Sequence, residues 1–338
     1  MSVLPFNIKY YGSTTMKDDD TAGPIGGAID KTKKVQFADV TTSGNIEIIS
    51  DDSTDTTQTV TVTGRSPSGG VISETKTLSG ETPVPMTTNT TWERFLKATK
   101  SGTTAGTVAV VMVTKTHSGT LQTGSANATA SKGPFAVLAA TASASDDAYN
   151  GMVLRVTGST PDEIREIIDY NGTTKEAFVN EDFGAVPGAV TYEIADGVVF
   201  DKGPNEVTEV RRMFYDASAN PSGGATKTYY EKFFVSNEHA TIDLTNAKLA
   251  EIAGGVSAKV AFGIPTTLND TGTNGGTNTR QTAPAGITFA STQLTLGASA
   301  DGNLTATNAH GVWAELTLAG GDAATNSFWT PETTGQST

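Results

Sequence analysis

Carboxylates are the side chains whose spacing comes closest to a catalytic or metal-binding pattern in this sequence. They form four clusters: Asp18, Asp19 and Asp20; Asp51, Asp52 and Asp55; Asp146 and Asp147; and Glu163 and Glu166. A glycosidase needs two carboxylates about 5–10 Å apart in a cleft, and calcium takes oxygen ligands from loops. The D-x-D-x-D-G calcium pattern is absent, and turn-forming residues surround the clusters. We predict solvated turn acids, with a calcium site as the alternative.

Other chemistry has less support from residue types and spacing. The three histidines, His117, His239 and His310, form no His-x-His or His-x3-His pair, and the sequence contains no cysteine. Isolated histidines are expected at turns and strand ends, and thiol chemistry and disulfides are excluded. Neither a G-x-S-x-G elbow nor a glycine-rich phosphate loop occurs. We therefore predict no catalytic, cofactor-binding or metal-binding residue, and no cofactor.

Aromatic side chains could form a platform on which sugar rings stack. The candidates are Tyr10, Tyr11, Tyr229, Tyr230 and Trp329. Neighbouring residues in a strand point to opposite faces, so paired tyrosines are expected to divide between core and surface. Trp92 and Trp313 are expected to be core or interface anchors. Sugar binding is the alternative to core packing for this set.

Composition points to strands as the elements that position these residues. Charged residues make up 17% of the 338 residues, and the chain contains 36 glycines, whereas soluble domains average about 25% charged residues. Threonine, which is abundant here, is stiff at χ1 and suits strands, while Gly and Asn favour turns. The net charge of −13 repels phosphate backbones, so no nucleic-acid partner is expected. No apolar run is long enough to span a membrane.

The order of apolar and polar residues predicts individual strands. Thr91–Lys100 fits a helix or a strand, and we favour a strand because the run ends at Ser-Gly between two hairpin-like segments. Val108–Val113 is apolar on both faces, which is typical of a central strand. Asn171-Gly172 between Arg165–Tyr170 and Lys175–Val179 predicts a hairpin.

Turn signals about every 8–12 residues predict an all-β protein of several modules. The predicted fold is a set of tandem β-sandwich domains, immunoglobulin-like or jelly-roll, with a small β-barrel module between them. The predicted boundaries are an N-terminal strand and arm (1–32), an immunoglobulin-like β-sandwich (33–117), a linker (118–133), a small β-barrel module (134–195) and a C-terminal β-sandwich (196–338).

Three parts of the sequence resemble modules of tailed-bacteriophage virion structural proteins. The first is GRSPSGGVISETKTLSGETPV followed by TWERFLKATKSGTTAGTVAVV, which resembles an immunoglobulin-like virion module. The second is LAATASASDDAYNGMVLRVTGSTPDEIREIIDYNGTTKEAFV, which is similar to a small β-module of phage tail proteins. The third comprises YYEKFFVSNEHATIDLTNAKL, APAGITF and HGVWAELTLAGG, which are similar to phage sandwich domains. The resemblance covers most of the chain from about Val35 to Leu318.

The resemblance implies a non-enzymatic structural component of the virion. Its sandwich faces, strand edges and terminal arms would contact tail, neck, portal or major capsid proteins, and it would form a homo-oligomer in the particle. We favour the neck or tail, with a capsid decoration or head-fibre protein as the alternative, and a receptor- or glycan-binding adhesin as a further one. The N-terminus lacks the pattern of a signal peptide, so we expect synthesis in the host bacterial cytoplasm. A hydrolase would need a cleft with paired acids, whereas Glu163 and Glu166 are expected at the surface.

Overall fold

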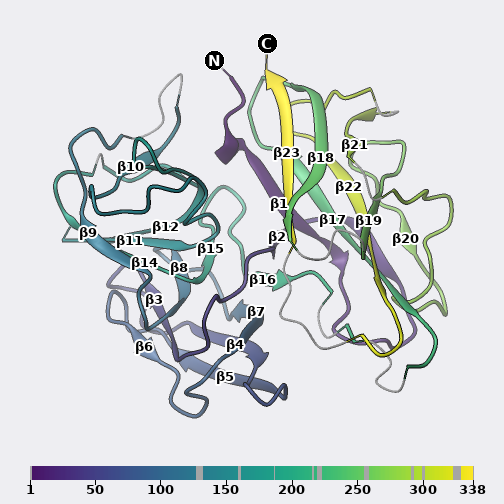
Figure 1. Cartoon of the computed structure of the whole chain (residues 1–338), viewed down its shortest axis with the longest axis horizontal. Helices are drawn as coiled ribbons and strands as arrows, with labels where there is room; N and C mark the ends of the chain where they lie inside the picture. Colours follow the sequence, from purple (N-terminus) through teal and green to yellow (C-terminus); the bar gives the residue numbers. More distant parts are fainter. Residues whose placement is uncertain are drawn as a thin grey trace. The chain divides into compact units, whose positions relative to one another are not determined.

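The computed structural model in Figure 1 is built almost entirely from strands, which confirms the all-β prediction. The structure describes residues 2–126, 132–158, 161–185, 187–214, 217–218, 223–254, 259–290, 293–298, 301–322 and 329–337, without the side chains of 251–254 and 329–330. Within these residues the single helical element is the 3-10 turn η1 (Pro5–Asn7). The chain forms two compact units, one from residues 1–3, 7–37 and 211–338 (unit 1) and one from 4–6 and 38–210 (unit 2).

Unit 2 begins as a β-sandwich. One layer has the order β7-β4-β5 and the other β15-β8-β3-β6. The strands are β3 (Ile46–Ser50), β4 (Thr59–Arg65), β5 (Val71–Thr77), β6 (Val84–Pro85), β7 (Arg94–Lys100), β8 (Val108–Met112) and β15 (Gly197–Phe200). Val60 and Val62 of one layer share a core with Ile48 and Val110 of the other, and all four are buried. Strand β7 confirms the strand predicted over Thr91–Lys100, and β8 is central as predicted.

The second part of unit 2 is a curved sheet around its own core. Its order is β10-β13-β12-β11-β14-β9, with β9 (His117–Thr120), β10 (Phe135–Val137), β11 (Val153–Thr157), β12 (Glu163–Asn171), β13 (Glu176–Val179) and β14 (Thr191–Ala195). Leu154, Ile167 and Ile194 are fully buried in this core. Strands β12 and β13 pair antiparallel across Asn171-Gly172, which confirms the predicted hairpin.

The stretch predicted as a linker (118–133) starts as part of this sheet. Ser118, Gly119 and Thr120 pair with β14. A Cβ atom at Gly119 would lie 2.8 Å from Ala139 Cβ and 3.2 Å from the Tyr192 hydroxyl. The small residue that suggested flexibility therefore permits close packing. Residues 127–131 of the predicted linker lie outside the described residues.

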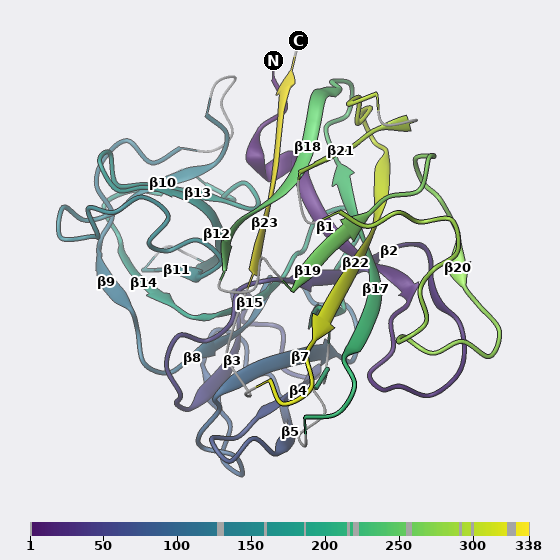
Figure 2. The same cartoon turned by 45° about the vertical axis from the view of Figure 1, so that its right-hand side comes forward.

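Unit 1 contains two sheets. The larger has the order β19-β22-β17-β1-β2, with β20 paired to β2, and the smaller is β21-β18-β23. The strands are β1 (Ile8–Thr15), β2 (Ile25–Gln36), β17 (Lys227–Asn237), β18 (Leu244–Gly254), β19 (Val260–Gly263), β20 (Thr273–Asn274), β21 (Leu294–Thr295), β22 (Ala309–Leu318) and β23 (Trp329–Ser337). Figures 1 and 2 both show β23 alongside β18. Between the two units the chain passes through β16 (Glu209–Arg212).

The segment predicted as an N-terminal strand and arm (1–32) is integral to unit 1. Strand β1 pairs with β17 on one side and β2 on the other, so the N-terminal strand is internal to the sheet. Its Tyr10 ring lies edge-on to Phe37 at 5.3 Å, and Phe37 lies 5.7 Å from Phe233. These aromatic contacts explain why the segment packs against the C-terminal region, from which it is distant in sequence.

Close backbone approach in the sandwich makes one glycine a sensitive position. A Cβ atom at Gly64 in β4 would lie 2.2 Å from the Arg94 carbonyl oxygen and 2.8 Å from the buried Trp92 ring. We expect Gly64→Ala to lower the free energy of unfolding by about 1–3 kcal/mol through overpacking, as measured by chemical denaturation. Gly102→Ala is the control because no atom lies within 4 Å of its added Cβ, and its effect should stay within about 0.5 kcal/mol. Equal effects of the two substitutions would contradict the packing described here.

Candidate functional site

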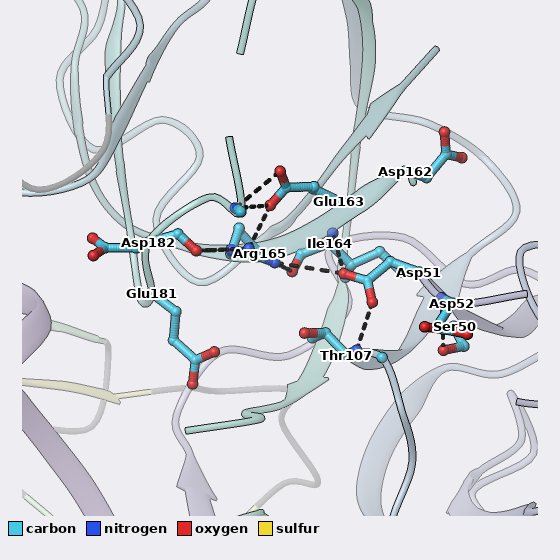
Figure 3. A network of polar contacts seen from close by, with 12 residues as sticks. Ser50, Asp51, Asp52, Thr107, Asp162, Glu163, Ile164, Arg165, Glu181 and Asp182 are labelled. Atoms are coloured by element: carbon cyan, nitrogen blue, oxygen red, sulfur yellow. Dashed lines mark hydrogen bonds and ion pairs between the residues drawn. The ribbon is translucent and has the colours of Figure 1, made fainter. Parts of the chain in front are cut away.

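A network of buried charges surrounds Arg165 in β12 and is the strongest candidate for a polar site in unit 2 (Figure 3). Arg165 Nη2 lies 2.5 Å from Glu163 Oε2, and Nη1 lies 3.5 Å from Asp51 Oδ2. The guanidinium also donates to the carbonyl oxygen of Asp182, from Nε at 3.0 Å and from Nη2 at 2.6 Å. Each of the three charged side chains is about nine-tenths buried.

The alternation of β12 explains this arrangement. Glu163 and Arg165 are two residues apart and therefore share one face of the strand. Ile164, between them, is fully buried in the core of the sandwich, whereas Leu154 and Val156, which lie opposite Arg165 and Glu163, belong to the core of the curved sheet. Strand β12 therefore contributes to both cores of unit 2, and the charge network lies at their junction.

Asp51 connects three segments of unit 2 through its carboxylate. It follows β3, and its Oδ1 accepts a hydrogen bond from Thr107 N at 2.6 Å, while Oδ2 accepts one from Ile164 N at 3.0 Å. Burial raises the pKa of Asp51 to about 6, although these two hydrogen bonds and Arg165 oppose the shift. The side chain thus holds the segment before β8 and the strand β12 at the end of β3.

Glu163 has a similar role on the other side of Arg165. Its Oε2 and Oε1 accept hydrogen bonds from Gly184 N at 2.8 and 3.0 Å. The carboxylates of Asp162 and Glu181, which are nearby in Figure 3, point away from Arg165. A cavity beside Ile164, lined also by Arg155 and Glu193, has a volume of ≈ 10 Å³, about the space of one water molecule. Neither Asp51 nor Glu163 lines this cavity; their carboxylates face backbone donors and Arg165.

The prediction of solvated turn acids is wrong for three residues of the sequence clusters. Asp51, Asp55 and Glu163 are 8%, 1% and 9% exposed. Glu163 was expected at the surface and is buried instead. No local sequence signal marks these residues, because the backbone N–H groups that they bind belong to other segments, such as those of Gly106, Thr107 and Gly184. The exposed Asp146 and Asp147 agree with the prediction and lie in the turn after residue 145.

Two further carboxylates of the sandwich bind backbone N–H groups in the same way. Asp55 accepts hydrogen bonds from Ala105 N and Gly106 N, at 2.7 and 2.9 Å. Glu74, a core-facing residue of β5 that the sequence analysis did not single out, accepts from the amides of three consecutive residues, Thr87, Thr88 and Asn89. Burial opposes ionisation of Glu74, but these hydrogen bonds outweigh it and lower its pKa to about 2.

In unit 1, buried cations hold the acidic loop of residues 18–20. Asp18 Oδ1 lies 2.9 Å from Arg211 Nη1, and Asp20 Oδ1 lies 2.5 Å from Arg280 Nε. Both arginine side chains are almost fully buried, while the two aspartates are 43% and 39% exposed. Glu231, between the arginines at 3.9 and 3.6 Å, has its pKa raised by burial. The aspartates therefore stay near the surface, as predicted, but are held in ion pairs.

A second buried cation in unit 1 anchors the loop that precedes β20. Lys232 Nζ lies 2.6 Å from Asp270 Oδ2 and donates to the carbonyl oxygens of Gly27 and Gly272 at 2.9 and 3.0 Å. Its ammonium also lies 4.9 Å from the Phe234 ring centroid. Burial lowers the pKa of Lys232. All the neighbours of this ammonium belong to the strand-and-loop framework of unit 1.

The histidines lie apart and bind or pack against the chain itself. His310 is fully buried, its Nδ1 accepts from Gly297 N at 2.9 Å, and its Nε2 lies 2.9 Å from the Pro265 carbonyl oxygen. Burial lowers its pKa, so the neutral ring donates through Nε2. His239 Nδ1 accepts from backbone N–H groups of its own turn, and the His117 ring lies 5.8 Å from Tyr149.

The aromatic residues considered for sugar stacking are not displayed as a platform. Tyr11, Tyr229 and Tyr230 are 7%, 1% and 8% exposed, and Tyr10 is half-buried, with its hydroxyl 2.9 Å from Thr333 Oγ1. The side chain of Trp329 lies outside the described residues. The tryptophans predicted as anchors, Trp92 and Trp313, are buried, at 1% and 3% exposure.

Three further indicators of function are a metal-binding cluster, a membrane-spanning helix and similarity to known proteins. Within the described ranges, no group of three or more His, Asp or Glu side chains is placed to hold a metal ion. The same part of the chain includes no helix of sufficient length and apolar character to cross a membrane. Comparison of the chain with protein-family models, with curated proteins and with solved structures finds no match.

The raised pKa of Asp51 predicts a pH dependence of stability. Because the folded pKa of about 6 exceeds the usual value of 3.8, the folded protein binds this proton more tightly than the unfolded chain. The stabilisation of the folded state by this proton is complete below pH 4 and is lost as the pH rises through 6. The substitution Asp51→Asn removes this contribution. Between pH 4 and 6, the unfolding free energy of the variant should therefore fall less than that of the wild type, by on the order of 2–3 kcal/mol. Urea denaturation at several pH values measures it.

The neighbouring acid Asp52, which is partly exposed, provides the control for this titration. The Asp52 carboxylate accepts hydrogen bonds from the backbone N–H and the hydroxyl of Thr54, and these hydrogen bonds lower its pKa. Asp52→Asn should therefore leave the slope of unfolding free energy against pH unchanged between pH 4 and 6. A wild-type slope that Asp51→Asn does not alter would show that Asp51 is ionised throughout this range.

Arg165 is expected to be essential to the network because two buried carboxylates face it. Arg165→Met leaves Asp51 and Glu163 without their cation and should cost about 3–5 kcal/mol of unfolding free energy. Adding Glu163→Gln to this variant should restore part of the loss, because one uncompensated charge is removed. Additive effects in the double-mutant cycle would contradict a coupled network.

Proposed function

We propose that this chain is a non-enzymatic structural component of a tailed-phage virion, located at the neck or tail. It would act there as a tail, collar or baseplate component that binds neighbouring virion proteins and further copies of itself. A position on the capsid, as a decoration or head-fibre protein, is the alternative location. Both locations require the same property, a rigid all-β framework with its binding surfaces on the outside.

The observation that carries the proposal is the use of the buried charges. Asp55, Glu74, Glu163 and Lys232 all bind the backbone of the chain's own connecting segments. Catalytic groups with perturbed pKa values usually face a cleft, whereas Asp51, with its raised pKa, faces backbone donors. Such contacts fix loops against strands, which favours a role in assembly over a role in turnover.

The sequence resemblance to virion modules supports the same proposal. The first resembling stretch supplies β5, β7 and most of β8, which lie in both layers of the sandwich. The second supplies β11, β12 and β13 of the curved sheet. The first stretch therefore falls within the sandwich and the second within the curved sheet, as expected if the modules are related through their folds.

Particle composition tests this proposal most directly. Intact phage particles from a lysate that expresses this chain should contain it in a fixed number of copies, as measured by quantitative mass spectrometry. A cryo-EM map of those particles should show its two units at the neck or tail, or on the capsid under the alternative. Absence of the chain from washed, intact particles would overturn the proposal.

A separate measurement distinguishes the adhesin alternative. The isolated chain should show no binding on a glycan array, because the tyrosines considered for stacking are buried or half-buried. Selective binding to one glycan class by the folded chain would favour the adhesin over the structural role.

A further inference from the structure

The outer face of the layer β7-β4-β5 has an unusual composition. Val60 and Val62 point into the core, so the alternate residues of β4 point outward, together with those directly opposite in β5 and β7. Arg94, opposite Arg65, is set apart because its guanidinium binds the buried carboxylate of Asp39. The other outward positions define what we call the threonine face: Thr59, Thr61, Thr63, Arg65, Val71, Ser73, Thr75, Thr77, Lys97 and Thr99.

Hydroxyl groups on the threonine face bind one another across the strands. Thr61 Oγ1 lies 2.7 Å from Thr75 Oγ1, and Thr63 Oγ1 lies 3.2 Å from Ser73 Oγ. Threonine has a restricted χ1, so these cross-strand pairs form an ordered surface that loses little side-chain entropy on binding. At its outer margin Val71 is 50% exposed, one of two large apolar side chains so exposed among the described residues.

The charge of the threonine face is opposite to that of the chain. The ten residues of the threonine face include two cations, Arg65 and Lys97, and no carboxylate, a local charge of +2, so the rest of the chain carries −15. The other three cations of strands β4, β5 and β7 are paired with carboxylates off the face: Lys76 with Glu74, Arg94 with Asp39 and Lys100 with Glu206. The one carboxylate of these strands, Glu74, points toward the core, where it binds backbone amides. The threonine face therefore presents hydroxyls, one valine and cations, with no carboxylate of its own strands.

The adjacent edge of the layer is poorly suited to strand addition. Strand β5 ends the layer, and Glu74 and Lys76 both occupy its core-facing positions. Inward-pointing charges on an edge strand disfavour pairing with a further strand. Binding through this part of the molecule is therefore expected to use the outer face of the layer.

We propose that the threonine face docks against an acidic surface of a second copy of this chain. The proposal rests on the proposed function and names a partner for it. Charge complementarity selects this occupant, because the face carries +2 and the rest of every copy carries −15. Two threonine faces would repel each other, so the contact joins different surfaces of the two copies. Such a head-to-tail contact generates a ring or a filament, the geometries of a neck or tail.

Sedimentation velocity of the full chain tests the proposal. A face of three seven-residue strands is about 24 Å long, so a weak contact is expected that salt screens. The wild-type chain should associate with increasing concentration in about 0.02 M NaCl and dissociate in about 0.5 M NaCl. Thr75→Glu places a carboxylate on the face and should raise the dissociation constant at least about tenfold.

Thr191→Glu is the matched control. Thr75 and Thr191 are both exposed strand residues, and each hydroxyl lies 2.7 Å from a cross-strand threonine hydroxyl, Thr61 and Thr157 respectively. Because Thr191 lies on β14, outside the threonine face, its variant should associate as the wild type does. Circular dichroism of both variants checks that they fold.

Each outcome has a distinct meaning. A wild-type chain that stays monomeric at every concentration in low salt would overturn the inference, although the chain could still be found in particles. Association that Thr75→Glu and Thr191→Glu weaken equally would also overturn it, while homo-oligomerisation as such would stand. Absence from particles would overturn the proposed function even if the threonine face mediates self-association.

Discussion

The structure depends on one constraint, that a buried charge must be hydrogen-bonded or paired. In unit 2, Asp51, Asp55, Glu74 and Glu163 meet this requirement largely through backbone N–H groups of connecting segments. The same contacts supply acceptors for amides that no strand ladder satisfies. Each buried carboxylate therefore stabilises a loop, and each of those loops supplies the donors that make the buried carboxylate tolerable.

This reciprocity has consequences for what the molecule can do. Short strands separated by many turns leave numerous backbone groups unpaired, and a chain with 17% charged residues has few ionisable groups to satisfy them. Many of its buried charges lie in such contacts, as Asp51 and Lys232 illustrate. The outer face of the layer β7-β4-β5 then consists mainly of neutral hydroxyl side chains, with one valine and two cations.

Much of the fold could be predicted from sequence because it depends on local patterns. Alternation and turn residues sufficed for strand β7, the central β8 and the Asn171-Gly172 hairpin. Contacts between distant segments could not be predicted, such as the pairing of β1 with β17 or the burial of Glu163 beside Arg165. A carboxylate in a turn has the same local sequence whether it faces water or an amide from another loop, so burial of Asp51 and Asp55 left no local signal.

Hydrogen–deuterium exchange of individual amides, followed by NMR, is the most direct measurement of this account. Because buried carboxylates bind them, the amides of Thr87, Asn89, Ala105, Gly106 and Gly184 should exchange as slowly as amides within the adjacent strands, despite lying in loops. Exchange of these amides at the rates of solvated loops would show that the buried carboxylates do not hold the connecting segments, and would contradict the account.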